Sequence, residues 1–223
     1  MASTLGEYDF WLFDLDGTLV DVEPSYRSSV IETVGDRLGH GFTEEERTVL
    51  WHGFGDRRQH LLERHSIDPE RFWKHFHEVE DPIARAEATY LFEDAEMMFA
   101  SLDRPAGLVT HCQRYLTDPV LDSLDIRDWF ESVLCCTEET GWKPDPRPIE
   151  RTMSAMGLSS GGTTRGVLVG DNQQDVGAAW NVGLDAVHVE RHGPRARGAC
   201  VLGDRRVRGL DELVGRSHEP AMD

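Results

Sequence analysis

Two hydrophobic patterns divide the chain. A short apolar run, Phe10-Trp11-Leu12-Phe13, ends abruptly in acidic and turn-forming residues and predicts a buried strand over 8–13. From about 22 to 91, apolar residues instead recur at spacings of three and four, which predicts a series of helices. These helices are expected over 25–38, 43–53, 57–65, 69–79 and 82–91.

Local signals support the beginnings of these helices. Thr43 and Glu46 have the spacing of a capping box, in which each side chain bonds the backbone N–H of the other residue. Asp68-Pro69 and Asp81-Pro82 combine a capping aspartate with a proline at the first helical position. The segment is therefore expected to form a block of short, well-delimited helices.

After about residue 92 the pattern alternates between strands and helices. Such alternation predicts a parallel sheet with right-handed crossovers, which is an α/β fold. The helical block therefore interrupts one α/β domain, made of the first eighteen residues and everything after about 92. Strands are expected over 106–110, 132–136, 166–169 and 185–189, and helices over 94–102, 116–130, 147–157, 175–182 and 210–214.

Charge composition narrows the class of partners. The 223 residues carry a formal net charge of −18, and the only lysines are Lys74 and Lys143. Phosphate backbones and anionic lipid surfaces repel such a chain, so we expect neither nucleic acid nor membrane as a partner. An acidic, lysine-poor composition is typical of salt-loving microbes, so we expect a halophilic protein.

Targeting signals are not evident. The chain has no apolar run long enough to span a membrane, and its N-terminus lacks the basic and apolar regions of a signal peptide. Cys112, Cys135, Cys136 and Cys200 show no C-x-x-C spacing and are expected to be reduced thiols. A cytoplasmic location follows as the expectation.

Polar residues collect where the predicted strands end. In an open α/β sheet, ligands bind beyond the carboxyl ends of the strands. Taken singly, each of these residues has a structural explanation as a turn former, a helix cap or a solvated side chain. Their occurrence at four successive strand ends favours a single site. The set comprises Asp14 and Asp16, Thr110 and His111, Lys143, and Asp171 and Asp175.

These residue types suit phosphoryl transfer. Hard carboxylate oxygens are ligands for Mg²⁺, which also takes substrate phosphate oxygens. A carboxylate can attack phosphorus when a cation and a lysine neutralise the phosphoryl charge. A second carboxylate can then manage the proton of the leaving group.

The chain resembles the haloacid dehalogenase-like (HAD) hydrolase superfamily, in its phosphoglycolate phosphatase-like branch. Asp14-Leu15-Asp16-Gly17-Thr18, Thr110, Lys143-Pro144 and Gly170-Asp171-x-x-x-Asp175 are similar to its four motifs, in the family's order. The resemblance implies a Rossmann-like core with strand order 3-2-1-4-5 and an inserted all-helical cap. It assigns 1–19 and 92–223 to the core, and 20–91 to the cap.

The resemblance also implies roles for the acidic residues. Asp14 would be the nucleophile and a Mg²⁺ ligand. Asp16 would be the general acid and base, with its backbone carbonyl on the metal. Asp171 would bind Mg²⁺, and Asp175 would support it directly or through water.

The remaining motif residues would hold the phosphate. Thr110 and the backbone N–H of His111 would bind its oxygens, and Lys143 would neutralise the phosphoryl group. His111 departs from the Asn or Ser that the family commonly has at this position. On the cap, Arg57 or Arg58 could meet a substrate carboxylate, or could be a solvated arginine at a turn.

The implied activity is a Mg²⁺-dependent phosphomonoesterase. Its substrate would be a small phosphorylated metabolite, either phosphoglycolate-like or a sugar phosphate, and the reaction would pass through an aspartyl-phosphate. The alternatives are a phosphomutase of the β-phosphoglucomutase type, a 2-haloacid dehalogenase, and a non-catalytic phosphate-binding protein. The sequence makes no prediction of the oligomeric state.

Overall fold

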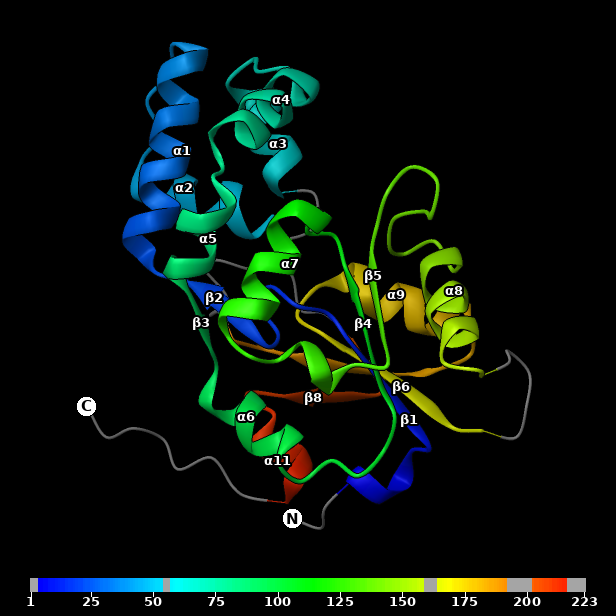
Figure 1. The fold of residues 1–223 in the computed structure, drawn as a ribbon. Helices are drawn as coiled ribbons and strands as arrows, with labels where there is room; N and C mark the ends of the chain where they lie inside the picture. The colour runs from blue at the N-terminus through cyan, green and yellow to red at the C-terminus, as the bar shows by residue number, and fades with distance from the viewer. Residues whose placement is uncertain (1–3, 54–56, 159–163, 192–201, 216–223) are drawn as a thin grey trace.

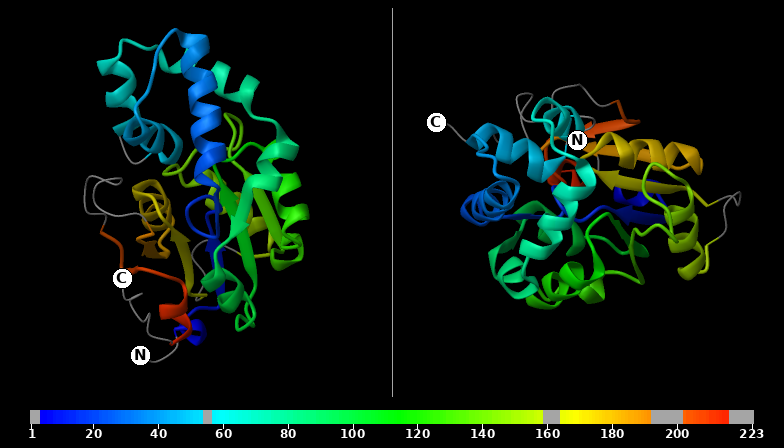
Figure 2. Two further views of the ribbon diagram at one scale, coloured as in Figure 1. Left: turned by 90° about the vertical axis from the view of Figure 1, so that its left-hand side faces the viewer. Right: turned by 90° about the horizontal axis from the view of Figure 1, so that it is seen from above.

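The computed structural model describes residues 4–53, 57–158, 164–191 and 202–215. In these residues a sheet-containing part and a group of helices lie one above the other, with the helices at the top of Figure 1. Figure 2 shows the same separation after a quarter turn about the vertical axis.

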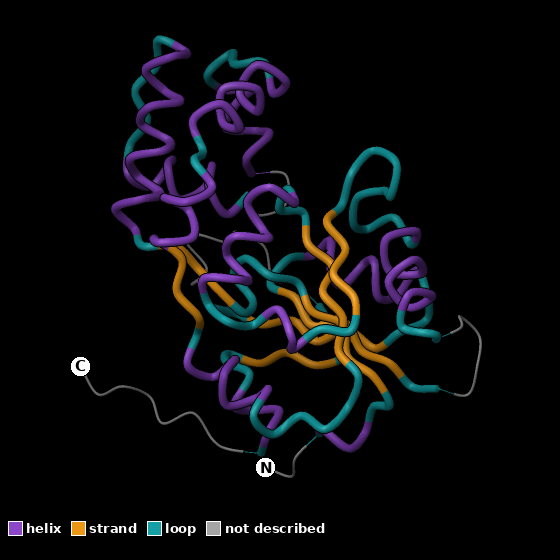
Figure 3. The backbone as a smooth tube through the Cα atoms, in the orientation of Figure 1, coloured by secondary structure: helices purple, strands orange, loops and turns teal. Residues whose placement is uncertain are grey.

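The sheet of the larger part has six parallel strands in the order β5-β4-β1-β6-β7-β8 (Figure 3). This confirms the predicted α/β fold and the order 3-2-1-4-5, and it adds β8 at one edge. The strands are β1 (Phe10–Phe13), β4 (Ala106–Thr110), β5 (Ser132–Cys135), β6 (Gly166–Gly170), β7 (Asp185–Val189) and β8 (Arg205–Val207).

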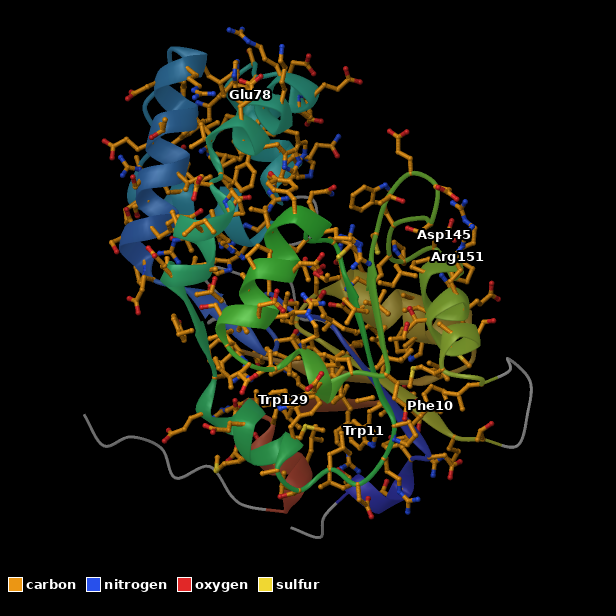
Figure 4. All side chains as sticks on the ribbon, in the orientation of Figure 1. Phe10, Trp11, Glu78, Trp129, Asp145 and Arg151 are labelled. Carbon is orange, nitrogen blue, oxygen red and sulfur yellow. The ribbon has the colours of Figure 1, made fainter. Side chains whose placement is uncertain are left out.

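Two hydrophobic clusters sandwich this sheet. Successive side chains of a strand point to opposite faces, so neighbours on β1 enter different clusters. Trp11 packs in one cluster and Phe10 in the other, and Figure 4 labels both. The first face is covered by α6 (Glu93–Phe99), α7 (Arg114–Ser123) and α11 (Asp211–Val214), and the second by α8 (Arg147–Ala155) and α9 (Gln173–Asn181).

The helical part has a hydrophobic cluster of its own, which includes Val34, Leu50 and Phe72. The capping box of Thr43 and Glu46 is present, as the sequence predicts. The aspartate caps before Pro69 and Pro82 are confirmed as well. The helices are α1 (Pro24–Leu38), α2 (Glu44–His52), α3 (Arg57–Arg64), α4 (Pro69–Val79) and α5 (Pro82–Ala88).

Two predicted helices extend into other secondary structure. The helix expected over 82–91 ends at Ala88, and β3 (Thr89–Leu91) then pairs antiparallel with β2 (Val20–Val22). Thr89 and Tyr90 favour a strand, and the distant β2 satisfies their backbone groups. The inserted segment is therefore not entirely helical. The division at 19/20 and 91/92 stays a prediction.

The second overlong helix was expected over 116–130. Helix α7 instead ends at Ser123, and a 3-10 turn follows at Arg127–Trp129. Asp125 lies between them with a φ of 54°, a left-handed backbone conformation that a continuing helix does not allow.

The described residues also bear on the thiols and on membrane insertion. Cys112, Cys135 and Cys136 are free, whereas Cys200 lies outside the described residues. Within the described ranges, we find no helix that combines the length and the apolar character needed to cross a membrane.

Candidate active site

The loops after β1 and β6 meet closely at the carboxyl edge of the sheet. Asp14 follows β1 directly, and its N–H donates to the carbonyl of Val169 at 2.9 Å. Gly17 turns the chain with a φ of +77°. A Cβ atom at Gly17 would lie 2.5 Å from Asp171 Oδ2, so only glycine lets the two loops approach this closely.

Three carboxylates gather beside one ammonium group at this edge. Oxygen atoms of Asp14, Asp171 and Asp175 all lie within 4.8 Å of one another, and each of these residues is buried. Lys143 Nζ lies 2.6 Å from Asp14 Oδ1 and 2.6 Å from Asp175 Oδ1. It also donates to the Val109 carbonyl at 2.8 Å. Lys143, in the loop after β5, thus places a fixed positive charge beside the acids that follow β1 and β6.

The electrostatics of this cluster favour an added cation. Burial raises the pKa of Asp14 to about 7, against the effect of Lys143, and Asp175 adds to the rise. The pKa of Lys143 is raised, although burial alone would lower it, because Asp14 and Asp175 face its ammonium group. One ammonium does not neutralise three carboxylates. A set of buried, hard oxygen donors with excess negative charge fits Mg²⁺.

Hydrogen bonds with neighbouring residues hold Asp171 and Asp175, the two acids that follow β6. Asp175 lies in the first turn of α9, and its Oδ2 accepts the N–H of the N-cap residue Asn172 at 3.0 Å in a capping box. Nε2 of His188, on β7, lies 3.0 Å from the Asp171 carbonyl oxygen. The start of α9 and a neighbouring strand therefore hold this loop in place.

Thr110 ends β4, and His111 begins the loop that follows it. The hydroxyl oxygen of Thr110 accepts the N–H of Cys112 at 3.0 Å, which leaves its own proton for another acceptor. Nε2 of His111 accepts the N–H of Lys143 at 2.9 Å. Burial, with Lys143 and Arg58 nearby, lowers the pKa of His111 to about 3, so its ring is neutral. The imidazole therefore braces the backbone of Lys143.

A cavity of about 190 Å³ lies over these residues and reaches the helical part. Trp51, Trp73 and Phe76 contribute its aromatic wall, and Asp14, Asp16 and Lys143 lie on its other side. The structure thus brings the helical part against the carboxyl edge of the sheet.

Of the two cap arginines singled out from the sequence, Arg58 lines this cavity. Its Nε and Nη2 donate to the carbonyls of Leu50 and Trp51, each at 2.7 Å, and its guanidinium lies 4.5 Å from the centre of the Trp73 ring. Burial lowers its pKa to about 10. Arg57 instead lines a separate hollow beside α2 and α3. Residues 54–56 of their loop lie outside the described residues.

Two further charged residues of the cavity are not evident in the sequence. Arg85, on α5, forms an ion pair with Asp16, and its guanidinium lies 4.8 Å from the centre of the Trp51 ring. Nη1 of Arg85 lies 3.7 Å from Oε1 of Glu80, the residue after α4. Both are buried and line the cavity. Asp16 and Arg85 are 69 residues apart, so no local spacing reveals the pair.

Comparison with known proteins identifies related chains. The profile of the family described as haloacid dehalogenase-like hydrolase matches residues 11–189. A protein of Agrobacterium fabrum named phosphoglycolate phosphatase is 29% identical over 189 residues, covering 80% of this chain and 78% of that protein. A protein of Escherichia coli with the same name is 26% identical over 206 residues, with 78% of each covered.

Solved structures share the fold. A putative haloacid dehalogenase-like hydrolase from Bacteroides fragilis superimposes with a TM-score of 0.75 at 22% identity, covering 93% of this chain and all of that one (100%). A putative phosphoglycolate phosphatase from Lactobacillus plantarum gives a TM-score of 0.75 at 19% identity, covering 93% and 98%.

Proposed function

Because the chain belongs to the haloacid dehalogenase-like hydrolase family, we propose that it is a Mg²⁺-dependent phosphatase. Its substrate is a small phosphorylated metabolite, either phosphoglycolate-like or a sugar phosphate, and an aspartyl-phosphate forms on the way. The observation that carries this proposal is the buried Lys143 ammonium, 2.6 Å from Asp14 and from Asp175, beside the carboxylate of Asp171. The curated relatives named phosphoglycolate phosphatase support it.

The first half of the reaction breaks the ester bond. An oxygen of Asp14 attacks phosphorus, the bond from phosphorus to the alcohol oxygen breaks, and Asp16 gives its proton to the leaving alkoxide. Lys143 and the hydroxyl of Thr110 stabilise the phosphoryl oxygens, together with the backbone N–H of His111. Asp14, Asp171 and the backbone carbonyl of Asp16 would hold Mg²⁺, with support from Asp175, and the bound cation would supply positive charge that offsets the charge of the phosphoryl group.

The second half restores the enzyme. Asp16, now ionised, takes a proton from a water molecule that attacks the phosphorus of phospho-Asp14. The bond between Asp14 and phosphorus breaks, inorganic phosphate leaves, and Asp16 is again protonated. A carboxylate at Asp16 favours this chemistry over 2-haloacid dehalogenation, whose enzymes generally lack an acid there.

The test is hydrolysis of p-nitrophenyl phosphate in multimolar KCl, with Mg²⁺ or with EDTA. We expect metal-dependent turnover in the wild type and its loss in Asp14→Asn. Asp103→Asn is the matched control, because the Asp103 side chain is 83% exposed. A folded wild type that hydrolyses neither this ester nor a panel of phosphorylated metabolites would contradict the proposal. Transfer of phosphate between sugar positions without release would indicate a mutase.

We also propose a cytoplasmic, high-salt setting. The net charge of −18 and the two lysines support it, since salt screens the repulsion between surface carboxylates. The same charge disfavours nucleic acid and anionic membranes as partners.

A further inference from the structure

Glu80 is a buried acid in the cavity with an unsatisfied oxygen. Its side chain is 3% exposed, and it lines the cavity beside the aromatic wall. Among the described residues, no hydrogen-bond donor reaches its Oε1. Arg85 Nη1, the cation that it faces, lies 3.7 Å away, beyond hydrogen-bonding distance. A buried carboxylate in this position lacks the donors that normally compensate its burial.

The neighbours of Glu80 are also short of partners. Within the described residues, the Tyr26 hydroxyl and Arg85 Nε have no hydrogen-bond partner. Burial raises the pKa of the Tyr26 hydroxyl, and the negative charge of Glu80 adds to the rise. Burial raises the pKa of Glu80 to about 7, against the effect of Arg85 and with that of Asp16. Of these three residues, Glu80 and Arg85 line the cavity, so this part of its wall offers polar atoms that a ligand can satisfy.

Glu80 lies on the side of the cavity where the proton is transferred. Arg85 stands between the two acids, paired with Asp16 and facing Glu80. Asp16 is the proposed donor to the leaving alkoxide, so the atoms that Glu80 meets belong to the alcohol and not to the phosphate. Arg58 and His111 line the same cavity, and the charge of Arg58 adds to the lowering of the His111 pKa that burial and Lys143 cause.

The charge on this side selects the kind of alcohol. A single arginine faces two acids here, so a leaving group with its own carboxylate adds negative charge beside Glu80. A hydroxyl group instead gives Glu80 the donor that it lacks. The rings of Trp51, Trp73 and Phe76 supply apolar surface for the C–H groups of such an alcohol.

We propose that Glu80 accepts a hydrogen bond from a hydroxyl group of the leaving alcohol and so selects polyol and sugar phosphates over esters that carry a carboxylate. This inference rests on the proposed phosphatase activity and chooses between its two substrate classes. Glu80 is then a specificity-determining residue, and the aromatic wall holds the carbon skeleton.

The test compares three two-carbon esters that differ in one group. They are ethyl phosphate, 2-hydroxyethyl phosphate and phosphoglycolate, assayed by phosphate release with Mg²⁺ in multimolar KCl. For the wild type, we expect kcat/KM for 2-hydroxyethyl phosphate to exceed that for each of the other two by about tenfold or more, because a buried acceptor discriminates strongly against ligands that leave it unpaired. Ribose 5-phosphate extends the comparison to a sugar.

Glu80→Gln removes the negative charge at nearly constant volume. We expect it to lower kcat/KM for 2-hydroxyethyl phosphate and to raise that for phosphoglycolate, so that their ratio falls by about tenfold or more. Glu78→Gln is the matched control, since the Glu78 side chain is 45% exposed, pairs with Arg37 and does not line the cavity. Figure 4 labels Glu78 at the top of the helical part, and we expect its replacement to leave the ratio unchanged. Unfolding temperatures verify that both variants are folded.

The possible outcomes distinguish the role of Glu80 from the phosphatase activity itself. A wild type that prefers phosphoglycolate overturns the inference and leaves the phosphatase proposal intact, as does a Glu80→Gln variant that changes all three esters equally. If Glu80→Gln does not fold, the wild-type ranking of the three esters still decides. A wild type that hydrolyses none of these esters, nor p-nitrophenyl phosphate, refutes the proposed function itself.

Discussion

Replacing Lys143 by methionine tests how the acidic cluster is held together. The change keeps an unbranched apolar side chain that matches lysine as far as Cε, and it removes the ammonium group that lies 2.6 Å from Asp14, 2.6 Å from Asp175 and 2.8 Å from the Val109 carbonyl. Deleting one partner of a buried ion pair typically costs about 3–5 kcal/mol. Proton uptake by Asp14, whose pKa is already raised to about 7, limits that loss. We therefore expect the lower end, about 3 kcal/mol.

The assay is thermal unfolding in EDTA and in Mg²⁺, at fixed pH and fixed KCl. A loss of about 3 kcal/mol lowers the Tm of a chain of this size by roughly 6–12 °C. Mg²⁺ should restore more of the Tm in the variant than it adds to the wild type, because the cation replaces charge that the lysine supplied.

The chain provides its own control, since it has only one other lysine. Lys74 is exposed on α4, so Lys74→Met should change stability by no more than about 0.5 kcal/mol. If Lys143→Met in EDTA unfolds at the wild-type temperature, or if the two lysine variants have the same Tm, the Lys143 ammonium does not stabilise the acidic cluster.

Three further predictions concern stability. The Tm of the wild type should rise between low salt and multimolar KCl as screening weakens the repulsion within a chain of net charge −18, and an unchanged Tm would refute a halophilic origin. Arg191→Lys should lower the free energy of unfolding in urea by about 2 kcal/mol, because lysine cannot donate to both oxygens of Asp94 as the arginine does, at 2.9 and 2.8 Å. An unchanged urea midpoint would show that this ion pair does not stabilise the fold. Burial alone would raise the pKa of Glu46, but hydrogen bonds from the Thr43 N–H and from His65 lower that pKa to about 2. Glu46→Gln should therefore destabilise the protein by about 0.5–1 kcal/mol at pH 7. That difference should shrink as pH falls from about 4.5, the ordinary pKa, towards 2, and a constant difference would contradict the assignment.

Most of the core fold can be predicted from the sequence, because buried parallel strands are short, apolar and bounded by turn-forming residues. Strand β4 was predicted with its observed bounds, Ala106–Thr110, and so was β7, Asp185–Val189. Strand β8 was missed, since Arg205-Arg206-Val207 contains one apolar residue and pairs only at the sheet edge. The sequence predicts helix for the residues of β3, because the strand partner β2 lies about seventy residues earlier in the chain and no local pattern reveals the pairing.

Some residues of the candidate site can be predicted from the sequence, and others are revealed only by the structure. Asp14 and Asp171 each follow a buried strand directly, so topology alone indicates that they meet. Lys143 stands out because the chain has almost no lysine. Glu80 and Arg85 carry no such signal, since helices α4 and α5 expose many charged residues and only the tertiary packing buries these two.

The proposed mechanism requires that Asp14 is phosphorylated during turnover. The most direct measurement is mass spectrometry of enzyme quenched in acid during turnover with Mg²⁺ and substrate, followed by proteolysis. We predict a peptide containing FDLDGTLVD that carries one phosphoryl group on Asp14, absent from substrate-free enzyme and from Asp14→Asn. A label on another residue, or rapid turnover of Asp14→Asn, would contradict the account.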